Sequence, residues 1–233
     1  LYAVQLGDKI ETINESVFEG CSSLSELTLG ENLKVIGNSA FSSATNLQVV
    51  HFPEGLQTIG DSAFMISGLQ SVLIPDSVKT IGDMAFCYTI SSKYFQLGKG
   101  LEYVGSMAFY GAFNTVFVVP KEVTGLNYGS ICADGPSTVY YDGTEEQLNQ
   151  LREIEAFYEL SDAGLFGNGS IEYINAIPVS SGYTEDYCYF EYPAGEIQLA
   201  DYLGFDSSVT VPSSVNDKSV TDINCTFSPV IDL

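Results

Sequence analysis

A phenylalanine recurs along the first half of the chain at an almost constant interval. The intervals are 23, 23, 22 and 23 residues, and the residues are Phe18, Phe41, Phe64, Phe86 and Phe109. Each follows a short apolar residue, usually alanine, and an aliphatic residue stands five positions earlier: Ile13, Ile36, Ile59, Ile81 and Val104. A repeat of this length predicts a solenoid, in which each coil packs on its neighbours and equivalent residues form one apolar column.

An alternating apolar segment follows most of these phenylalanines, as in Leu24, Leu27 and Leu29. Later coils lose the first leucine but keep a pair such as Phe95 and Leu97, and a sixth, weaker unit contains Ile131, Val139 and Tyr141. Side chains that point inward at a period of two predict one β-strand per coil. Glycine or asparagine follows the aliphatic residue of each coil, at positions 14, 37, 60, 82, 105 and 127. Since these residue types tolerate positive φ, we expect a left-handed turn there.

The strings IGNSAF, IGDSAF and IGDMAF, with the 23-residue period, resemble the BspA-like leucine-rich repeat family over residues 1–143. The resemblance implies a right-handed leucine-rich repeat solenoid of about six coils, each with a β-strand and short turn or helical segments. It also implies a cell-surface or secreted protein of bacteria or some protists, and some members of the family resemble adhesins that bind host matrix proteins or other bacteria. The sequence contains no catalytic constellation, so we expect no enzyme activity.

The chain after the repeats divides into a cap and a β-rich segment. Residues 144–158 are expected to form a helix, with Thr144 and Gln147 as a capping box and Leu148, Leu151 and Ile154 on one face. This cap, taken as residues 144–160, would cover the open end of the repeat array. Residues 161–233 predict a small β-rich segment leading into a further partial repeat that includes Phe227 and Leu233.

Composition excludes several partners and sites. Asp and Glu number 30 against 8 Lys and Arg, which gives a net charge of −22. Such a surface repels phosphate backbones and anionic lipid, so we expect no binding to nucleic acid or to a membrane surface. No run of about 18 apolar residues exists, so we expect no membrane insertion. The sequence contains one histidine, His51, and no calcium-loop or zinc spacing, so we expect no metal and no cofactor. The chain begins with Leu1 and shows no signal peptide, so we expect a piece of a longer secreted or surface protein.

The five cysteines are widely spaced and include no CxxC pair. Cys21 aligns with Ala44 and Ser67, which favours a small buried wall position over a reactive thiol. A disulfide between Cys188 and Cys225 would suit a secreted protein, but only their nearness in the sequence favours it.

The outward positions of the predicted strands are the candidate binding site. They form two rows, and we expect a protein partner to contact Val49, His51, Leu73, Tyr94, Gln96, Val116, Val118 and Tyr140. Several are apolar or aromatic, whereas a solvated sheet face is usually polar. The alternative is that the helix or the C-terminal segment folds over this face.

Three functions remain open from the sequence. The first is a non-catalytic adhesion or protein-binding module that uses this strand face. The second is a structural spacer without a ligand, whose contact would be self-association through open coil ends. The third is an enzyme in residues 161–233 with carboxylates such as Glu185 and Glu191, which no paired spacing supports.

Overall fold

The computed structural model describes residues 1–112, 115–131, 138–154, 156, 170–173, 180–183, 187–191, 195–202 and 211–223. The chain divides into two compact units, unit 1 from Leu1 to Ile174 and unit 2 from Asn175 to Leu233.

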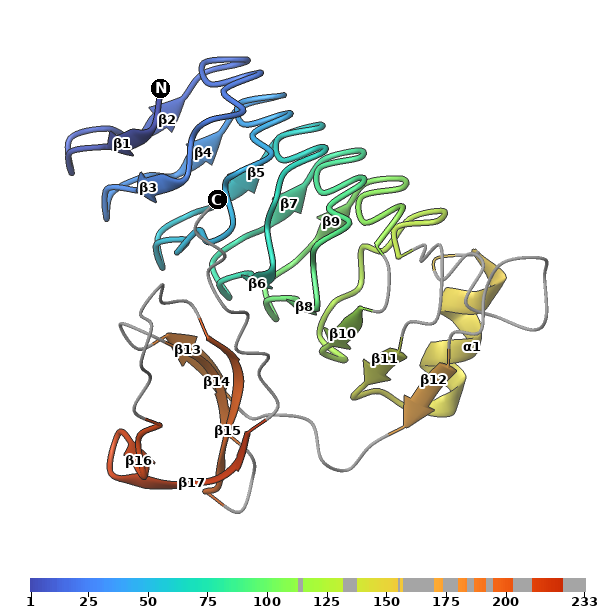
Figure 1. Cartoon of the computed structure of the whole chain (residues 1–233). Coiled ribbons are helices and arrows are strands. Elements are labelled where there is room, and N and C mark those ends of the chain that lie inside the picture. The colour runs from blue at the N-terminus through green and yellow to red at the C-terminus, as the bar shows by residue number, and fades with distance from the viewer. Residues whose placement is uncertain are drawn as a thin grey trace. The chain divides into compact units, whose positions relative to one another are not determined.

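Unit 1 is a parallel β-solenoid whose coils follow one another from the N-terminus to helix α1 (Figure 1). One of its sheets consists of two-residue strands that end on the repeating aliphatic residue. These strands, in their order across the sheet, are β2 (Thr12–Ile13), β4 (Val35–Ile36), β5 (Thr58–Ile59), β7 (Thr80–Ile81) and β9 (Tyr103–Val104). Their register pairs each aliphatic residue with its equivalent in the next coil, as the repeat predicts.

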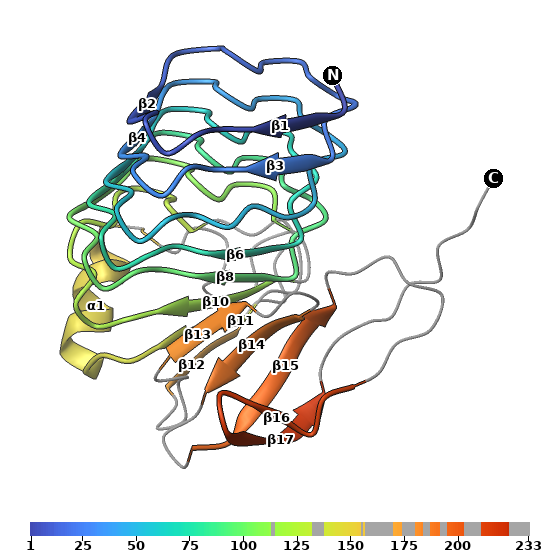
Figure 2. The same cartoon turned by 90° about the vertical axis from the view of Figure 1, so that its left-hand side faces the viewer.

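The strands that follow the phenylalanines form a second parallel sheet, seen face-on in Figure 2. Its members are β6 (Ser71–Leu73), β8 (Tyr94–Gln96), β10 (Val116–Val119), β11 (Thr138–Tyr141) and β12 (Ser170–Tyr173). In the first coils, β1 (Ala3–Gln5) pairs with β3 (Glu26–Thr28). Residues 47–53 form no strand, although Val50 and Phe52 are buried as expected. The next coil is one residue shorter, with Phe64 and Leu69 five residues apart instead of six.

The repeating phenylalanines form a stacked column. Centroids of successive rings are 5.1, 5.2, 5.4 and 5.4 Å apart from Phe18 to Phe109, and their planes differ by at most 14°. The rings of Phe41, Phe64, Phe86 and Phe109 are fully buried, whereas Phe18 in the first coil is only partly buried. Ile131 takes the column position in the sixth coil and is also buried. The predicted apolar column is therefore present.

The left-handed turns lie at other positions than the sequence suggests. None of Gly37, Gly60, Gly82 and Gly105 has a positive φ. Positive φ values, between 53° and 79°, occur two residues before and two residues after the column position: Ser16, Ser39, Ser62, Met84, Met107 and Gly129 before it, and Gly20, Ser43, Ile66, Tyr88 and Gly111 after it. These residues turn their N–H groups toward the next coil, so that Ile66 donates to the carbonyl of Cys87 and Tyr88 to that of Tyr110.

Close contact between coils, and not a positive φ, explains why glycine recurs at this position of the repeat. A Cβ atom built on Gly60 would lie 2.7 Å from the amide nitrogen of Asn38 and 2.8 Å from the carbonyl carbon of Gly37. On Gly82 it would lie 2.5 Å from the amide nitrogen of Asp61. No side chain fits at these distances, so the glycines permit backbone approach between coils.

Ile66 places a β-branched side chain in the left-handed region, which is strained for such residues. We therefore expect Ile66→Gly to raise the free energy of unfolding of unit 1 by about 1 kcal/mol. Ile90→Gly is the matched control, because Ile90 is also exposed but has no positive φ and should lose stability instead. Urea unfolding followed by circular dichroism measures both changes, and equal losses of stability in the two variants would contradict the strain.

Helix α1 (Glu145–Glu153) lies between β11 and β12 in the chain and packs on the apolar core, and β12 adds a further strand to the second sheet after it. Its capping box has both reciprocal hydrogen bonds: the Thr144 N–H donates to Oε1 of Gln147, and the Gln147 N–H donates to Oγ1 of Thr144. Leu148 and Leu151 are buried in the apolar core of the array. Ile154 was expected on the same face but is exposed, because the helix ends one residue earlier.

Unit 2 contains a mixed sheet in the order β13-β14-β15-β17-β16. Its strands are β13 (Ser180–Tyr183), β14 (Tyr187–Glu191), β15 (Ile197–Tyr202), β16 (Ser214–Val215) and β17 (Lys218–Ile223). Asn216 and Asp217 both have positive φ and join β16 to β17 in a tight hairpin. Phe227 and Leu233, which the sequence assigned to a further repeat, lie outside the described residues.

Candidate interaction surface

The outward positions of the second sheet form the two rows that the sequence predicts. Strand register aligns Ser71, Tyr94, Val116 and Thr138 in one row, and Leu73, Gln96, Val118 and Tyr140 in the other. The register continues into β12 at Ser170 and Glu172, beyond the strands that the repeat pattern predicts. The alternation S-I-E-Y is the sequence signal for this strand, and its Ile171 and Tyr173 pair in register with Val139 and Tyr141.

Exposure varies strongly among the eight proposed site residues. His51 is exposed, and Val49, Gln96, Val116 and Tyr140 are half-buried. Leu73 and Tyr94 retain 8% of their accessible surface and Val118 retains 2%, so the expectation of an exposed side chain needs correction at these three positions. Neighbouring side chains in such rows lie about 4.8 Å apart and cover one another, which contributes to this burial. Val49 and His51 also lie on residues 47–53, which form no strand.

His51 is the most accessible of the eight side chains. Partial burial lowers the pKa of its imidazole from the ordinary value of 6.5, so the ring is neutral at neutral pH. A neutral imidazole offers one hydrogen-bond donor and one acceptor. His51 is therefore suited to a polar contact with a partner rather than to attraction of an acidic group.

No group of three or more His, Cys, Asp or Glu residues within the described ranges is arranged to hold a metal ion. Likewise, the described helix is not long and apolar enough to cross a membrane.

Repeat length, stacked phenylalanines and parallel sheets agree with a known repeat family. The family described as "BspA type Leucine rich repeat region" matches residues 1–130 in six copies. The chain belongs to this family. No curated protein matches the chain.

Two solved structures resemble this BspA-type chain. The pneumococcal vaccine antigen PcpA has 19% sequence identity and a TM-score of 0.54, over 74% of this chain and 42% of its own. A leucine-rich repeat protein from Bacteroides ovatus ATCC 8483 has 19% identity and a TM-score of 0.39, over 61% of this chain and 56% of its own. The BspA-type chain thus spans less than half of the PcpA chain, and at this identity the likeness to PcpA shows the fold alone.

The BspA-type array contains two free cysteines among the described side chains. Cys87 is buried, whereas Cys21 is half-buried because the first coil has only one neighbouring coil. The described part of the chain does not include Cys132, Cys225 or the side chain of Cys188. The suggested disulfide between Cys188 and Cys225 therefore lies outside the described residues.

Burial raises the pKa of Cys87 to about 11, from 9.0. Because only the thiolate reacts with alkylating reagents, we expect Cys87 in the folded protein to resist iodoacetamide at about pH 8. It should react once urea unfolds unit 1. Peptide mass spectrometry measures the labelling, with the half-buried Cys21 as the internal comparison. Native labelling of Cys87 as fast as that of Cys21 would contradict the burial.

Proposed function

We propose that the chain is a non-catalytic, cell-surface or secreted module that binds a protein partner through the strand face. The strand face is the set Val49, His51, Leu73, Tyr94, Gln96, Val116, Val118 and Tyr140 together with the polar Glu26 and Thr28 of β3. All of these except the buried Leu73, Tyr94 and Val118 are accessible to a partner.

The difference between the two sides of the sheet carries this proposal. Inward positions stay apolar in every coil, for example Val72, Phe95 and Phe117, and all three are buried. The accessible outward positions differ from coil to coil: they include the exposed Glu26, Thr28 and His51 and the half-buried Gln96, Val116 and Tyr140. A stacked array fixes the spacing of such unlike side chains, so one coil after another presents a different contact to a partner.

Location and adhesion are further parts of the proposal. The fold is shared with a protein described as a pneumococcal vaccine antigen, which supports exposure outside a cell. The net charge of −22 disfavours nucleic acid and anionic lipid and leaves a protein as the favoured partner.

Biolayer interferometry against purified extracellular matrix proteins and bacterial surface proteins tests the proposal. We expect saturable binding of at least one of them, weakened at least about tenfold by His51→Ala combined with Gln96→Ala. Val17→Ser is the control, because Val17 is exposed but lies outside the strand face. Equal binding by the double variant would contradict the assigned face, and an absence of binding across the panel would favour a structural spacer.

A further inference from the structure

A second surface lies along the turns that contain the phenylalanine column. Each turn of the first five coils has two left-handed positions, and the first two coils place serine or glycine at both of them. The third to fifth coils place Ile66, Met84, Tyr88 and Met107 at four of their six such positions, and Ser62 and Gly111 at the other two. Bulky side chains are unfavourable in this conformation, so their presence at exposed turns points to a role other than stability.

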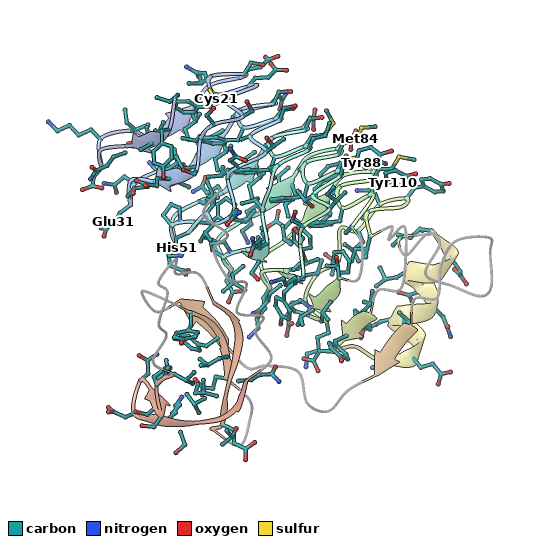
Figure 3. All side chains as sticks on the ribbon, in the orientation of Figure 1. Cys21, Glu31, His51, Met84, Tyr88 and Tyr110 are labelled. Carbon is teal, nitrogen blue, oxygen red and sulfur yellow. The ribbon has the colours of Figure 1, made fainter. Side chains whose placement is uncertain are left out.

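Three of these side chains are exposed, and Met107 is half-buried. Ile66, Met84 and Tyr88 retain 43%, 42% and 44% of their accessible surface. All three methionines of the chain, Met65, Met84 and Met107, lie on these turns. We call the set Met65, Ile66, Met84, Tyr88, Met107 and Tyr110 the Met–Tyr ridge. Figure 3 shows Met84, Tyr88 and Tyr110 along one edge of unit 1, away from Glu31 and His51.

The two tyrosines of the Met–Tyr ridge hold each other in place. Their rings meet edge to face, with centroids 5.3 Å apart and planes at 82°. Tyr88 also lies across Gly111, where a Cβ atom would be 2.6 Å from the Cδ1 atom of Tyr88. The ring of Tyr88 is thus fixed by its neighbours although its outer part is exposed.

The charge beside the Met–Tyr ridge has one sign. The turns at residues 60–68, 82–91 and 105–112 contain Asp61 and Asp83 and no lysine or arginine. The Oδ1 atom of Asp61 accepts a hydrogen bond from the backbone N–H of Asp83 in the next coil at 2.9 Å. The Oδ1 atom of Asp83 likewise accepts one from the backbone N–H of Ser106 at 2.9 Å. Both aspartates remain exposed. Desolvation, and then the negative charge of Asp83 and Asp61, raise the pKa of the nearby Tyr103.

We propose that the Met–Tyr ridge binds a basic, apolar segment of a partner protein. Methionine side chains adapt their shape to varied apolar groups, and surfaces rich in methionine serve this purpose. The faces of Tyr88 and Tyr110 attract arginine or lysine cations, and Asp61 and Asp83 complement the same charge. A second copy of this chain fits poorly, since its own turns carry the same negative charge. This surface does not depend on the strand face.

Fluorescence anisotropy with two labelled synthetic peptides tests the proposal on the full chain. One has leucine and arginine at helical spacing, and the other has serine in place of each leucine. We expect saturable binding of the first only. The variant Met84→Ser with Tyr88→Ser should weaken it at least about tenfold. Serine is native at the equivalent positions 62 and 43, so the coil geometry accommodates it.

Two double variants that each remove two negative charges provide a second test of the proposal. Asp61→Asn with Asp83→Asn keeps the hydrogen bonds, as native Asn38 does in the second coil, but removes two charges. It should weaken binding by about fivefold, whereas Glu31→Gln with Glu54→Gln removes two charges elsewhere and should leave it unchanged. Equal affinity for both peptides, or equal weakening by both charge pairs, would overturn the proposal as nonspecific attraction. A dimer in sedimentation that Met84→Ser dissociates would overturn it in favour of a second copy.

Discussion

Replacing Phe64 with alanine should lower the free energy of unfolding of unit 1 by about 3–5 kcal/mol. Phe64 is fully buried at the centre of the column, between the rings of Phe41 at 5.2 Å and Phe86 at 5.4 Å. The ring of Phe64 also meets that of Phe52 edge to face, with the two centroids 5.6 Å apart. Removal of the ring would leave a cavity between three coils, and a solenoid held by contacts between neighbours cannot close it without moving whole coils.

Urea unfolding followed by circular dichroism measures this loss, and peptide-level hydrogen exchange locates it in unit 1. Ile90→Ala is the control, since Ile90 is an exposed apolar residue of the same array and should change stability by less than about 0.5 kcal/mol. A loss for Phe64→Ala as small as that of Ile90→Ala would show that the column does not support the fold.

Gly82→Ala should lower the free energy of unfolding by about 3 kcal/mol, although alanine adds a single methyl group. This group would lie 2.5 Å from the amide nitrogen of Asp61 and 2.7 Å from the carbonyl carbon of Gly60. Both atoms belong to the backbone of the preceding coil, so relief requires the coils to move apart. That movement also disturbs the hydrogen bond from the Gly82 N–H to the carbonyl of Ile59.

Gly55→Ala is the matched control for this substitution. The nearest atom to its added Cβ would be the carbonyl oxygen of Glu31 at 3.6 Å, which is an ordinary contact, and Gly55 has no positive φ. Thermal unfolding should separate the two variants clearly. If Gly82→Ala unfolds at the same temperature as Gly55→Ala, close contact is not the reason for glycine at this position.

The column, the inward strand pairs and the capping box could be predicted because each depends on regular spacing of apolar or capping residues. Phe41 and Ile131 are buried as their periodic positions require. The turns could not be predicted in the same way. Glycine suits both positive φ and close backbone approach, and its place in the repeat does not distinguish them.

Other differences arise from features that have no periodic signal. Positive φ at Ile66 and Tyr88 opposes the preference of those residue types, so only the structure reveals it. Burial of Tyr94 and Val118 likewise depends on what surrounds an outward position, which alternation along one strand does not specify. The Met–Tyr ridge has no periodic signal either, because four of its residues occupy positions where most coils have serine or glycine, and Met65 and Tyr110 directly follow a phenylalanine of the column.

Both proposed surfaces require neighbouring coils to hold equivalent side chains in register, and a double-mutant cycle tests this most directly. The cycle measures the unfolding free energies of Phe41→Leu, Phe64→Leu and the double variant, with Phe18 and Phe86 as a control pair separated by two rings of the column. We expect a coupling of about 0.5–1.5 kcal/mol between Phe41 and Phe64 and additive effects for the control pair. Additive effects for Phe41 and Phe64 as well would contradict the stacking of coils on which the interpretation rests.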